Sequence, residues 1–312
     1  MSETKRQYLP TGLWVVATPI GNLEDLTPRA RDALSRAEAV LCEDTRRTSK
    51  LLAALGVRAT LKRFDAHSSD REVESVVSEL RAGKTFALVT DAGTPAISDP
   101  GALLVQEARK AGVAVTPIPG VSAVATLLSV CGFIENEFTF RGFFPRKKSE
   151  RERELKSARL SAVSRVFAWF ESPERIAESL ELIAGIEREF GAALTVCVAK
   201  ELTKIYEKSF WGSASEVSHA VLGEIKSEGA RGEWCFAIRF PEQRAADSES
   251  IEQSEGGAGW HLALQCLLDS NIAPSEAVKR VSHRFGIGKK AVYDLALKLS
   301  GKLSDKKNEV GD

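Results

Sequence analysis

The sequence predicts an α/β protein with two domains and a small helical module at its C-terminal end. Apolar runs typical of strands alternate with stretches typical of helices up to residue 241, which favours sheets covered by helices. A polar, acid-rich segment then interrupts the pattern, and three short amphipathic stretches follow it. With 312 residues, of which 43% are hydrophobic, the chain is long enough to bury more than one core.

The first domain is predicted to span residues 13–132, after a polar N-terminal segment of residues 1–12. Thr27 before Pro28 predicts a helix start, because a threonine hydroxyl can cap a helix and proline fits its first position. The same reasoning places a helix start at Asp99 and Pro100, and Glu72–Arg81 is predicted to be an amphipathic helix. The strand-like runs between the helices predict a parallel sheet; they are Leu13–Ala17, Ala39–Cys42, Phe86–Thr90 and Val113–Thr116.

The second domain is predicted to span residues 133–241 and to be α/β with a larger antiparallel share. Its strand-like runs are Phe138–Gly142, Val163–Phe170, Leu194–Ala199 and Trp234–Phe240. Residues 242–257 contain five acidic residues and only one large apolar residue, which predicts a flexible linker. Residues 258–312 give three amphipathic helices with a tight turn at Phe285–Gly288, and this pattern resembles a small helix-turn-helix module.

Composition excludes several classes of protein. The 43 basic and 43 acidic residues cancel, so overall charge indicates no particular partner. The N-terminus lacks the apolar core of a signal peptide, and the longest apolar region, Val113–Phe133, is interrupted by prolines and glycines and cannot span a membrane. Five dispersed cysteines argue against a disulfide framework and a metal cluster, which favours a reducing cytoplasm; they are Cys42, Cys131, Cys197, Cys235 and Cys266.

Three loops rich in small and turn-forming residues follow predicted strands, at the edge where open α/β sheets bind ligands. They are Thr18–Leu23, Asp91–Gly101 and Pro119–Ala123. Such residues let a ligand approach the backbone closely. None of the three contains the G-x-G-x-x-G of dinucleotide sites, and the chain has no G-x-x-x-x-G-K-[ST] phosphate loop.

Five ordered motifs resemble the tetrapyrrole methylase superfamily and, within it, the branch that methylates small-subunit ribosomal RNA. They are Thr18–Leu23, Glu43–Arg46, Asp91–Pro95, Phe170–Pro173 and Lys200–Lys204, and the resemblance runs from about Leu13 to about Leu299. It implies two α/β domains with a cleft for S-adenosylmethionine between them, and methylation of the ribose 2′-hydroxyl of a cytidine in the decoding region. It also implies a homodimer that acts on small-subunit ribosomal RNA, within the assembled subunit, without a metal and away from membranes.

For the cofactor, the resemblance assigns roles to residues of the three loops. They are Pro19, Ile20 and Gly21 in the first loop, Asp91, Gly93, Thr94 and Ile97 in the second, and Ser122 and Ala123 in the third. Phe170 would pack against the adenine and Trp234 would close the pocket. The alternative for these two side chains is that they are ordinary core aromatics.

For catalysis, the candidates are charged residues at predicted strand ends, because these positions face the ligand in an α/β fold. They are Glu43, Asp44, Arg46, Glu171, Arg175, Lys200 and Glu201. A ribose hydroxyl is poorly ionised at neutral pH, so the reaction needs a group that accepts its proton or stabilises its developing charge. The alternative is an ion-pair network that holds the domains together. The chain carries Asp65 and Glu174 where relatives carry histidine, which argues against a general base at either position.

Two stretches of the chain are strongly basic. Eight basic residues and three acidic ones occur between Arg141 and Arg159, and seven basic residues and one acidic residue occur between Lys279 and Lys302. Such patches bind phosphates electrostatically, although a charge run can also be a solvated helix face. The candidate RNA-binding residues are Arg146, Lys147, Lys148, Lys279, Arg280, Lys289 and Lys290.

Two other functions remain open at this point. A methylase of a corrin or porphyrin would match much of the superfamily, but the basic stretches and the C-terminal helices argue against it. A non-catalytic RNA-binding relative would explain the residues that depart from the family, but the intact loops argue against that reading.

Overall fold

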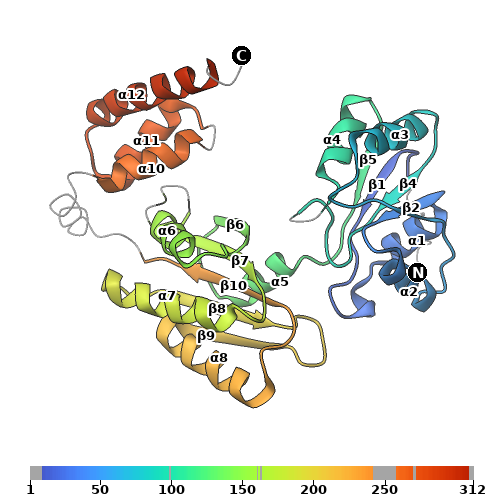
Figure 1. Cartoon of the computed structure of the whole chain (residues 1–312), viewed down its shortest axis with the longest axis horizontal. Coiled ribbons are helices and arrows are strands. Elements are labelled where there is room, and N and C mark those ends of the chain that lie inside the picture. The colour runs from blue at the N-terminus through green and yellow to red at the C-terminus, as the bar shows by residue number, and fades with distance from the viewer. Residues whose placement is uncertain are drawn as a thin grey trace, which may run out of the picture. The chain divides into compact units, whose positions relative to one another are not determined.

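The computed structural model describes residues 9–97, 100–159, 161, 164–241, 258–269 and 272–308 (Figure 1). The chain forms two compact units. The first consists of Met1–Val130 and Lys200–Lys208, and the second of Cys131–Ala199 and Ser209–Asp312. The predicted linker, Asp99 and most of the predicted N-terminal segment lie outside the described residues. Within the described ranges, no helix has the length and apolarity needed to cross a membrane.

The first unit contains a five-stranded sheet in the order β3-β2-β4-β1-β5, and all of its paired strands are parallel. This confirms the predicted parallel sheet. The short β3 was not predicted, because a three-residue strand with two basic residues carries no apolar run. The strands are β1 (Leu13–Val16), β2 (Ala39–Cys42), β3 (Leu61–Arg63), β4 (Phe86–Leu88) and β5 (Val115–Ile118).

Helices cover both faces of this sheet. Leu34 and Leu52, from α1 and α2, belong to one core, whereas Val76 and Leu104, from α3 and α4, belong to the other. The Thr27 hydroxyl accepts a hydrogen bond from the third residue of α1, as its capping role predicts. The helices are η1 (Leu23–Asp25), α1 (Pro28–Arg36), α2 (Thr45–Ala54), α3 (Asp70–Arg81), α4 (Ala102–Lys110) and α5 (Ala123–Val130).

The start of α4 differs from the sequence-based prediction of a cap at Asp99. The helix begins at Ala102, and its N-cap is Gly101, with a φ of 114° and no side-chain cap. This positive φ favours glycine, and a Cβ at Gly101 would also lie 2.6 Å from Leu88 Cδ2 of β4. The helix therefore begins two residues after Pro100.

The strand order creates a topological switch point between β2 and β4. After β2 the chain continues outward to β3, whereas after β4 it crosses to β5 at the opposite edge. Neighbouring strands whose connections leave in opposite directions open a crevice at their carboxyl ends, and open α/β sheets bind ligands there. The sequence predicted only that a ligand binds at the carboxyl edge of the sheet. The strand order places the expected site between β2 and β4.

The second unit contains a mixed five-stranded sheet in the order β6-β7-β10-β8-β9. β7 pairs antiparallel with β10 and parallel with β6. β9 was not predicted, because its residues alternate between partly buried and exposed and form no apolar run. The strands are β6 (Phe138–Phe143), β7 (Val166–Glu171), β8 (Thr195–Lys200), β9 (Lys208–Ser213) and β10 (Trp234–Arg239).

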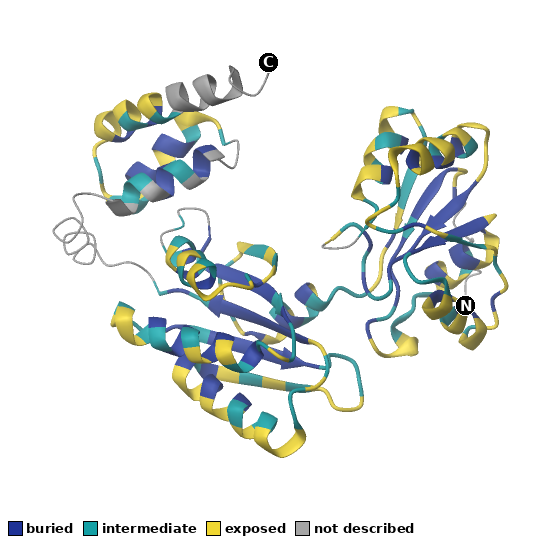
Figure 2. Ribbon diagram, viewed as in Figure 1, coloured by how far each residue is buried: buried dark blue, intermediate teal, exposed yellow. Residues whose placement is uncertain are grey.

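Three helices and one face of this sheet enclose an aromatic core. Trp169 stacks between Phe167 and Phe236, with ring centroids 5.9 and 5.3 Å apart, and Phe144 meets both Trp169 and Phe236 edge to face. The strands of both units are largely dark blue in Figure 2, whereas the outer helix faces are exposed. The helices are α6 (Lys148–Arg159), α7 (Ile176–Phe190) and α8 (Ala214–Glu228).

Three further helices follow the predicted linker and share their own core, as the sequence predicts. They are α10 (Ala258–Asp269), α11 (Pro274–Phe285) and α12 (Lys289–Asn308). Leu264, Val281 and Val292 are fully buried there. Gly286 ends α11 in the left-handed conformation, with a φ of 66°, which produces the predicted tight turn.

Candidate active site

The loops after β1 and β4 are joined by backbone hydrogen bonds. Thr18 and Gly93 form an isolated antiparallel bridge, in which each amide donates to the other carbonyl, at 2.9 and 3.0 Å. The Thr18 hydroxyl also donates to the Thr90 carbonyl at 3.1 Å. Gly93 has a φ of 85°, a conformation that favours glycine. The two loops therefore present a common surface built mainly from backbone.

The loop after β5 packs against the same surface. The Thr94 hydroxyl donates to the Val121 carbonyl at 3.1 Å. A Cβ at Gly120 would lie 2.8 Å from the Ala17 Cβ, so the close approach of these loops depends on glycine. All nine predicted cofactor residues of the three loops lie at this carboxyl edge: Pro19, Ile20, Gly21, Asp91, Gly93, Thr94, Ile97, Ser122 and Ala123.

A pocket of about 380 Å³ lies at the switch point. The Asp44 amide donates to Asp91 Oδ1 at 3.3 Å, which connects the loops after β2 and β4. Asp91 Oδ2 also pairs with Arg47 at 3.2 Å. The structure thus brings the catalytic candidates Glu43, Asp44 and Arg46 together with Asp91. The pocket is lined by Glu43, Asp44, Thr45, Arg46, Arg47, Arg63 and Asp91.

The Asp44 and Asp65 carboxylates accept hydrogen bonds from backbone amides of their own loops. Asp44 accepts the Arg46 amide at 2.8 Å, and this hydrogen bond holds the pKa of Asp44 below its ordinary value. Asp65 accepts the His67 amide, which lowers the pKa of Asp65, and it pairs with Arg63 at 2.8 Å. Both groups are therefore ionised at neutral pH. The Arg46 side chain is 90% exposed and lies 3.6 Å from Asp44, so it remains accessible to a ligand.

The segment Lys200–Lys208 belongs to the first unit and meets its first loop. The Thr203 hydroxyl accepts a hydrogen bond from the Asn22 amide at 3.1 Å. A Cβ at Gly21 would lie 2.3 Å from Lys204 Cγ, so the segment approaches too closely for any larger residue. Glu201 and Thr203 have φ values of 54° and 68°, a conformation that costs non-glycine residues about 1–3 kcal/mol each and is concentrated at functional sites. Lys200 is 4% exposed, and Glu201 pairs with Lys204 at 2.7 Å.

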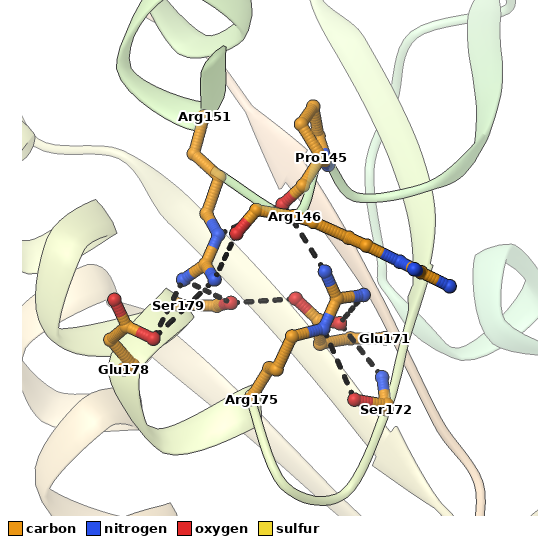
Figure 3. Close-up of polar contacts among 8 residues, drawn as sticks. All are labelled: Pro145, Arg146, Arg151, Glu171, Ser172, Arg175, Glu178 and Ser179. Carbon is orange, nitrogen blue, oxygen red and sulfur yellow. Dashed lines mark hydrogen bonds and ion pairs between the residues drawn. The ribbon is translucent and has the colours of Figure 1, made fainter. Parts of the chain in front are cut away.

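Glu171 and Arg175 belong to a different group, a polar network around the buried Glu171 carboxylate in the second unit (Figure 3). Glu171 accepts hydrogen bonds from the Ser172 amide at 2.8 Å and the Ser179 hydroxyl at 2.6 Å, and it pairs with Arg175. The Glu171 side chain is 0% exposed. Its carboxylate oxygens are thus engaged within the unit. We call this set, with Arg151 and Glu178, the Glu171 network.

Phe170 and Trp234 lie on opposite faces of their sheet. In the β7/β10 register, Trp234 pairs with Glu171, and Cys235 pairs with Phe170. Trp234 is 2% exposed in the aromatic core and donates to the Arg231 carbonyl at 3.1 Å. Trp234 is therefore a core aromatic in this structure, which is the alternative that the sequence left open for it. Phe170 packs on the other face, edge to face with Phe140 at 4.9 Å.

The first basic stretch divides into exposed and internal residues. Arg146, Lys147 and Lys148 are exposed, as expected for RNA-binding candidates. Arg151 is 2% exposed, because it lies on the same side of α6 as the buried Leu155. The charge count along the sequence therefore overstates the basic surface of this stretch.

The second basic stretch surrounds the turn between α11 and α12. Lys279, Lys289 and Lys290 are exposed, whereas Arg280 pairs with Glu276 at 2.9 Å. Lys279, Arg280 and Lys289 line a pocket of about 570 Å³ together with His283 and Arg284. This pocket offers a concentrated positive surface.

Three cysteines that are distant in sequence lie together in the second unit. The thiols of Cys131 and Cys197 are hydrogen-bonded, which raises the pKa of Cys131 and lowers that of Cys197. Burial, with the charge of Cys197 nearby, raises the pKa of Cys235 to about 12. Among the described residues no group of side chains suited to a metal ion is found, and these cysteines pack as small apolar residues.

The chain is similar in sequence to known methyltransferases. The family model of Tetrapyrrole (Corrin/Porphyrin) Methylases matches residues 12–218. Ribosomal RNA small subunit methyltransferase I of Xylella fastidiosa is 40% identical over 284 residues, which cover 91% of this chain and 98% of that relative. The chain belongs to this methyltransferase family. Its members of the same name from Bacillus subtilis and Escherichia coli O157:H7 are each 34% identical, over 90% and 93% of this chain and 92% and 96% of the relatives.

Solved structures of two other methyltransferases share the fold. The methyltransferase CobJ has a TM-score of 0.51 and 17% identity, over 75% of this chain and 95% of its own. The cobalt precorrin-4 methyltransferase CbiF has a TM-score of 0.50 and 18% identity, over 73% of this chain and 94% of its own. These likenesses confirm the predicted fold class.

Several residues of the site were not singled out from the sequence. Arg47 and Arg63 line the switch-point pocket, and Arg151 belongs to the Glu171 network. Arg47 could have been found as a charge directly beside a predicted catalytic motif. Arg63 ends an unpredicted strand, so no local pattern indicated its position.

Proposed function

We propose that the chain transfers a methyl group from S-adenosylmethionine to the ribose 2′-hydroxyl of a cytidine in the decoding region of small-subunit ribosomal RNA. The observation that carries this proposal is the switch-point pocket, where the loops after β2 and β4 meet three arginines. The names of relatives that are 34–40% identical over nearly the whole chain support the RNA substrate. The cytidine, its ribose oxygen and the decoding region rest on the motif resemblance.

The carboxyl edge of the first sheet suits S-adenosylmethionine. Gly120 and Gly93 keep the loops free of side-chain bulk, so that backbone groups can contact a ligand. The Thr90 hydroxyl is buried and, among the described residues, has no hydrogen-bond partner. Leaving such a group unsatisfied costs about 1–3 kcal/mol, which a polar ligand group would offset. S-adenosylmethionine supplies an activated methyl group, so the protein has to position it against the acceptor oxygen.

The polar residues of the pocket support the handling of a nucleotide. Arg46 is exposed at the rim, where a guanidinium can bind a phosphate or stabilise negative charge developing on the ribose oxygen. Asp44 and Asp91 hold the two loops together. Glu43 and Glu201 are the candidates for accepting the hydroxyl proton, and Lys200 is the candidate for stabilising the charge that develops on the oxygen. We assign Glu171 and Arg175 to positioning, because their charges are used inside the second unit.

The exposed basic residues support contact with RNA phosphates. Arg146, Lys147 and Lys148 form one group, and Lys279, Lys289 and Lys290 form another, with Arg280 beside it. A corrin or porphyrin substrate would not require two groups of exposed basic side chains. The solved structures that share the fold are too distant in sequence to favour that substrate. A homodimer and a cytoplasmic location among ribosomal subunits complete the proposal, and light scattering of the purified protein would measure its oligomeric state.

Methyl transfer from labelled S-adenosylmethionine to small ribosomal subunits that lack this modification tests the proposal. We expect one methyl group on one cytidine ribose, located by nuclease digestion and mass spectrometry. Arg46→Ala should reduce the rate, while Arg109→Ala, a change in the last turn of α4, serves as a matched control. Label in a different nucleotide would refute the cytidine assignment. No label, with cofactor binding intact, would refute the proposed substrate or favour the non-catalytic alternative.

A further inference from the structure

The loop between β6 and α6 is held by two guanidinium groups. The Pro145 carbonyl accepts hydrogen bonds from Arg151 Nε at 2.9 Å and from Arg175 Nη1 at 3.3 Å. Arg151 Nη2 donates to the Arg146 carbonyl at 2.9 Å. Two consecutive carbonyl groups are therefore fixed by side chains from α6 and from the residue before α7 (Figure 3).

Both guanidinium groups are themselves held by the other members of the Glu171 network. Arg175 pairs with Glu171 and donates to Ser172 Oγ at 3.1 Å. Arg151 lies 3.3 Å from Glu178 and 3.4 Å from Ser179 Oγ, and Ser179 in turn donates to Glu171. The two arginines and two glutamates balance in charge. The Arg151 guanidinium and the Glu171 carboxylate are buried, so removing the partners of either one would leave a charge without compensation inside the unit.

The loop held by these contacts carries exposed positive charges. Figure 3 shows the Arg146 side chain extending away from Arg151, while its carbonyl faces the Arg151 guanidinium. Lys147 and Lys148 follow, and both are exposed. The buried Phe144 precedes them, and its amide donates to the Phe170 carbonyl at 2.9 Å. The backbone that presents the three basic side chains is thus fixed on both sides.

We propose that Arg151 is a positioning residue for RNA binding, which fixes Arg146, Lys147 and Lys148 in the arrangement that contacts RNA phosphates. This inference rests on the proposed RNA substrate. Its physical basis is preorganisation: side chains on an ordered backbone lose less conformational entropy when they bind. Arg151 itself is buried and acts only through the loop. Lysine could not replace it fully, because an ammonium group lacks the planar fork of donors that reaches both carbonyls.

The test compares Arg151→Met and Arg151→Lys with Leu155→Ala, a change at a buried position on the same helix. Arg151→Met should raise KM for small ribosomal subunits about tenfold and change kcat and cofactor affinity less than about twofold, as expected for lost preorganisation. Arg151→Lys should recover part of the loss. Leu155→Ala should lower the free energy of unfolding without the change in KM, which separates positioning from general stability.

A second comparison asks whether Arg151 acts through the basic loop. In a protein that carries Arg146→Ala, Lys147→Ala and Lys148→Ala, adding Arg151→Met should raise KM no further. Hydrogen exchange without RNA should show faster exchange of the Arg146 and Lys147 amides in Arg151→Met. The proposal is overturned if Leu155→Ala raises KM as much as Arg151→Met, or if Arg151→Met acts equally in the triple variant. Failure of the unmodified protein to methylate or bind subunits would instead refute the proposed function.

Discussion

The backbone amide of Asp44 donates a hydrogen bond to Oδ1 of Asp91, 3.3 Å away, although 47 positions separate the two residues in the chain. The contact joins the loops of two neighbouring strands whose connections leave in opposite directions. Asp91 also pairs with Arg47, so one carboxylate organises both sides of the pocket.

Replacing Asp91 should therefore disturb the site more than the fold. Asp91→Ala removes both interactions and should lower methyl transfer at least about tenfold, while the free energy of unfolding falls by about 1 kcal/mol, as for the removal of one hydrogen bond. Asp91→Asn keeps an acceptor oxygen for the Asp44 amide and should retain more activity. Rates of methyl transfer and urea unfolding measure both effects. Full activity of Asp91→Ala would exclude this role.

Thr94→Arg should abolish binding of S-adenosylmethionine without unfolding the protein. Thr94 belongs to the loop after β4 and donates to the Val121 carbonyl in the loop after β5, so a long cationic side chain would occupy the proposed cofactor site. Isothermal titration calorimetry measures the loss. Thr94→Ser keeps the hydroxyl and should bind normally, and normal binding by Thr94→Arg would place the cofactor elsewhere.

Neutralising the basic turn of the C-terminal helices should weaken RNA binding and leave cofactor binding unchanged. The triple change Lys279→Ala, Lys289→Ala and Lys290→Ala removes exposed charges around one surface. The slope of log K against log salt should decrease by about 0.7–0.9 for each phosphate that the variant no longer neutralises. Lys110→Ala, at an exposed lysine of the first unit that pairs with Glu107, is the matched control. An unchanged salt slope would remove this surface from the RNA interface.

Cys235 should make the protein less stable at alkaline pH. Its pKa is raised from 9.0 to about 12 in the folded protein, so the unfolded chain releases this proton first as the pH rises. Stability from this group is therefore complete below about pH 9 and lost towards about pH 12, by about 1.4 kcal/mol at pH 10. Urea unfolding in reductant at about pH 8 and about pH 10 measures the loss, which should be smaller in Cys235→Ala. Equal losses in both proteins would contradict the assignment.

The sequence predicted the strands that contain an apolar or aromatic run, including the partly exposed β6. β2 runs from Ala39 to Cys42 as predicted, because all four residues are buried and the run ends where polar residues begin. β3 and β9 were not predicted, since they contain no apolar run and are stabilised by pairing with neighbours that the local sequence does not show. The fold class followed from the alternation of strand-like and helix-like stretches, whereas the order of the strands in the sheet could not be predicted from it.

Within the candidate site, the sequence identified loops better than side-chain roles. Glycines and prolines after a strand indicate where the backbone must turn, as at Gly93 and Gly120. A charged residue at a strand end can face a ligand or an internal partner. Only the structure shows that the Arg46 side chain is exposed whereas that of Glu171 is buried against internal partners. Arg151 could have been placed inside from its spacing of four residues before Leu155, since both lie on one side of α6.

Because Lys200–Lys208 returns to the first unit, the two units cannot be expressed separately as two continuous segments of the chain. The polypeptide passes from one to the other after Val130, after Ala199 and again after Lys208. No single cut in the coding sequence yields a complete first unit, so a shortened chain ending at Val130 would lack the residues that meet Gly21 and Asn22. During synthesis, the segment that completes the first unit is made only after β6, β7 and β8 of the second unit.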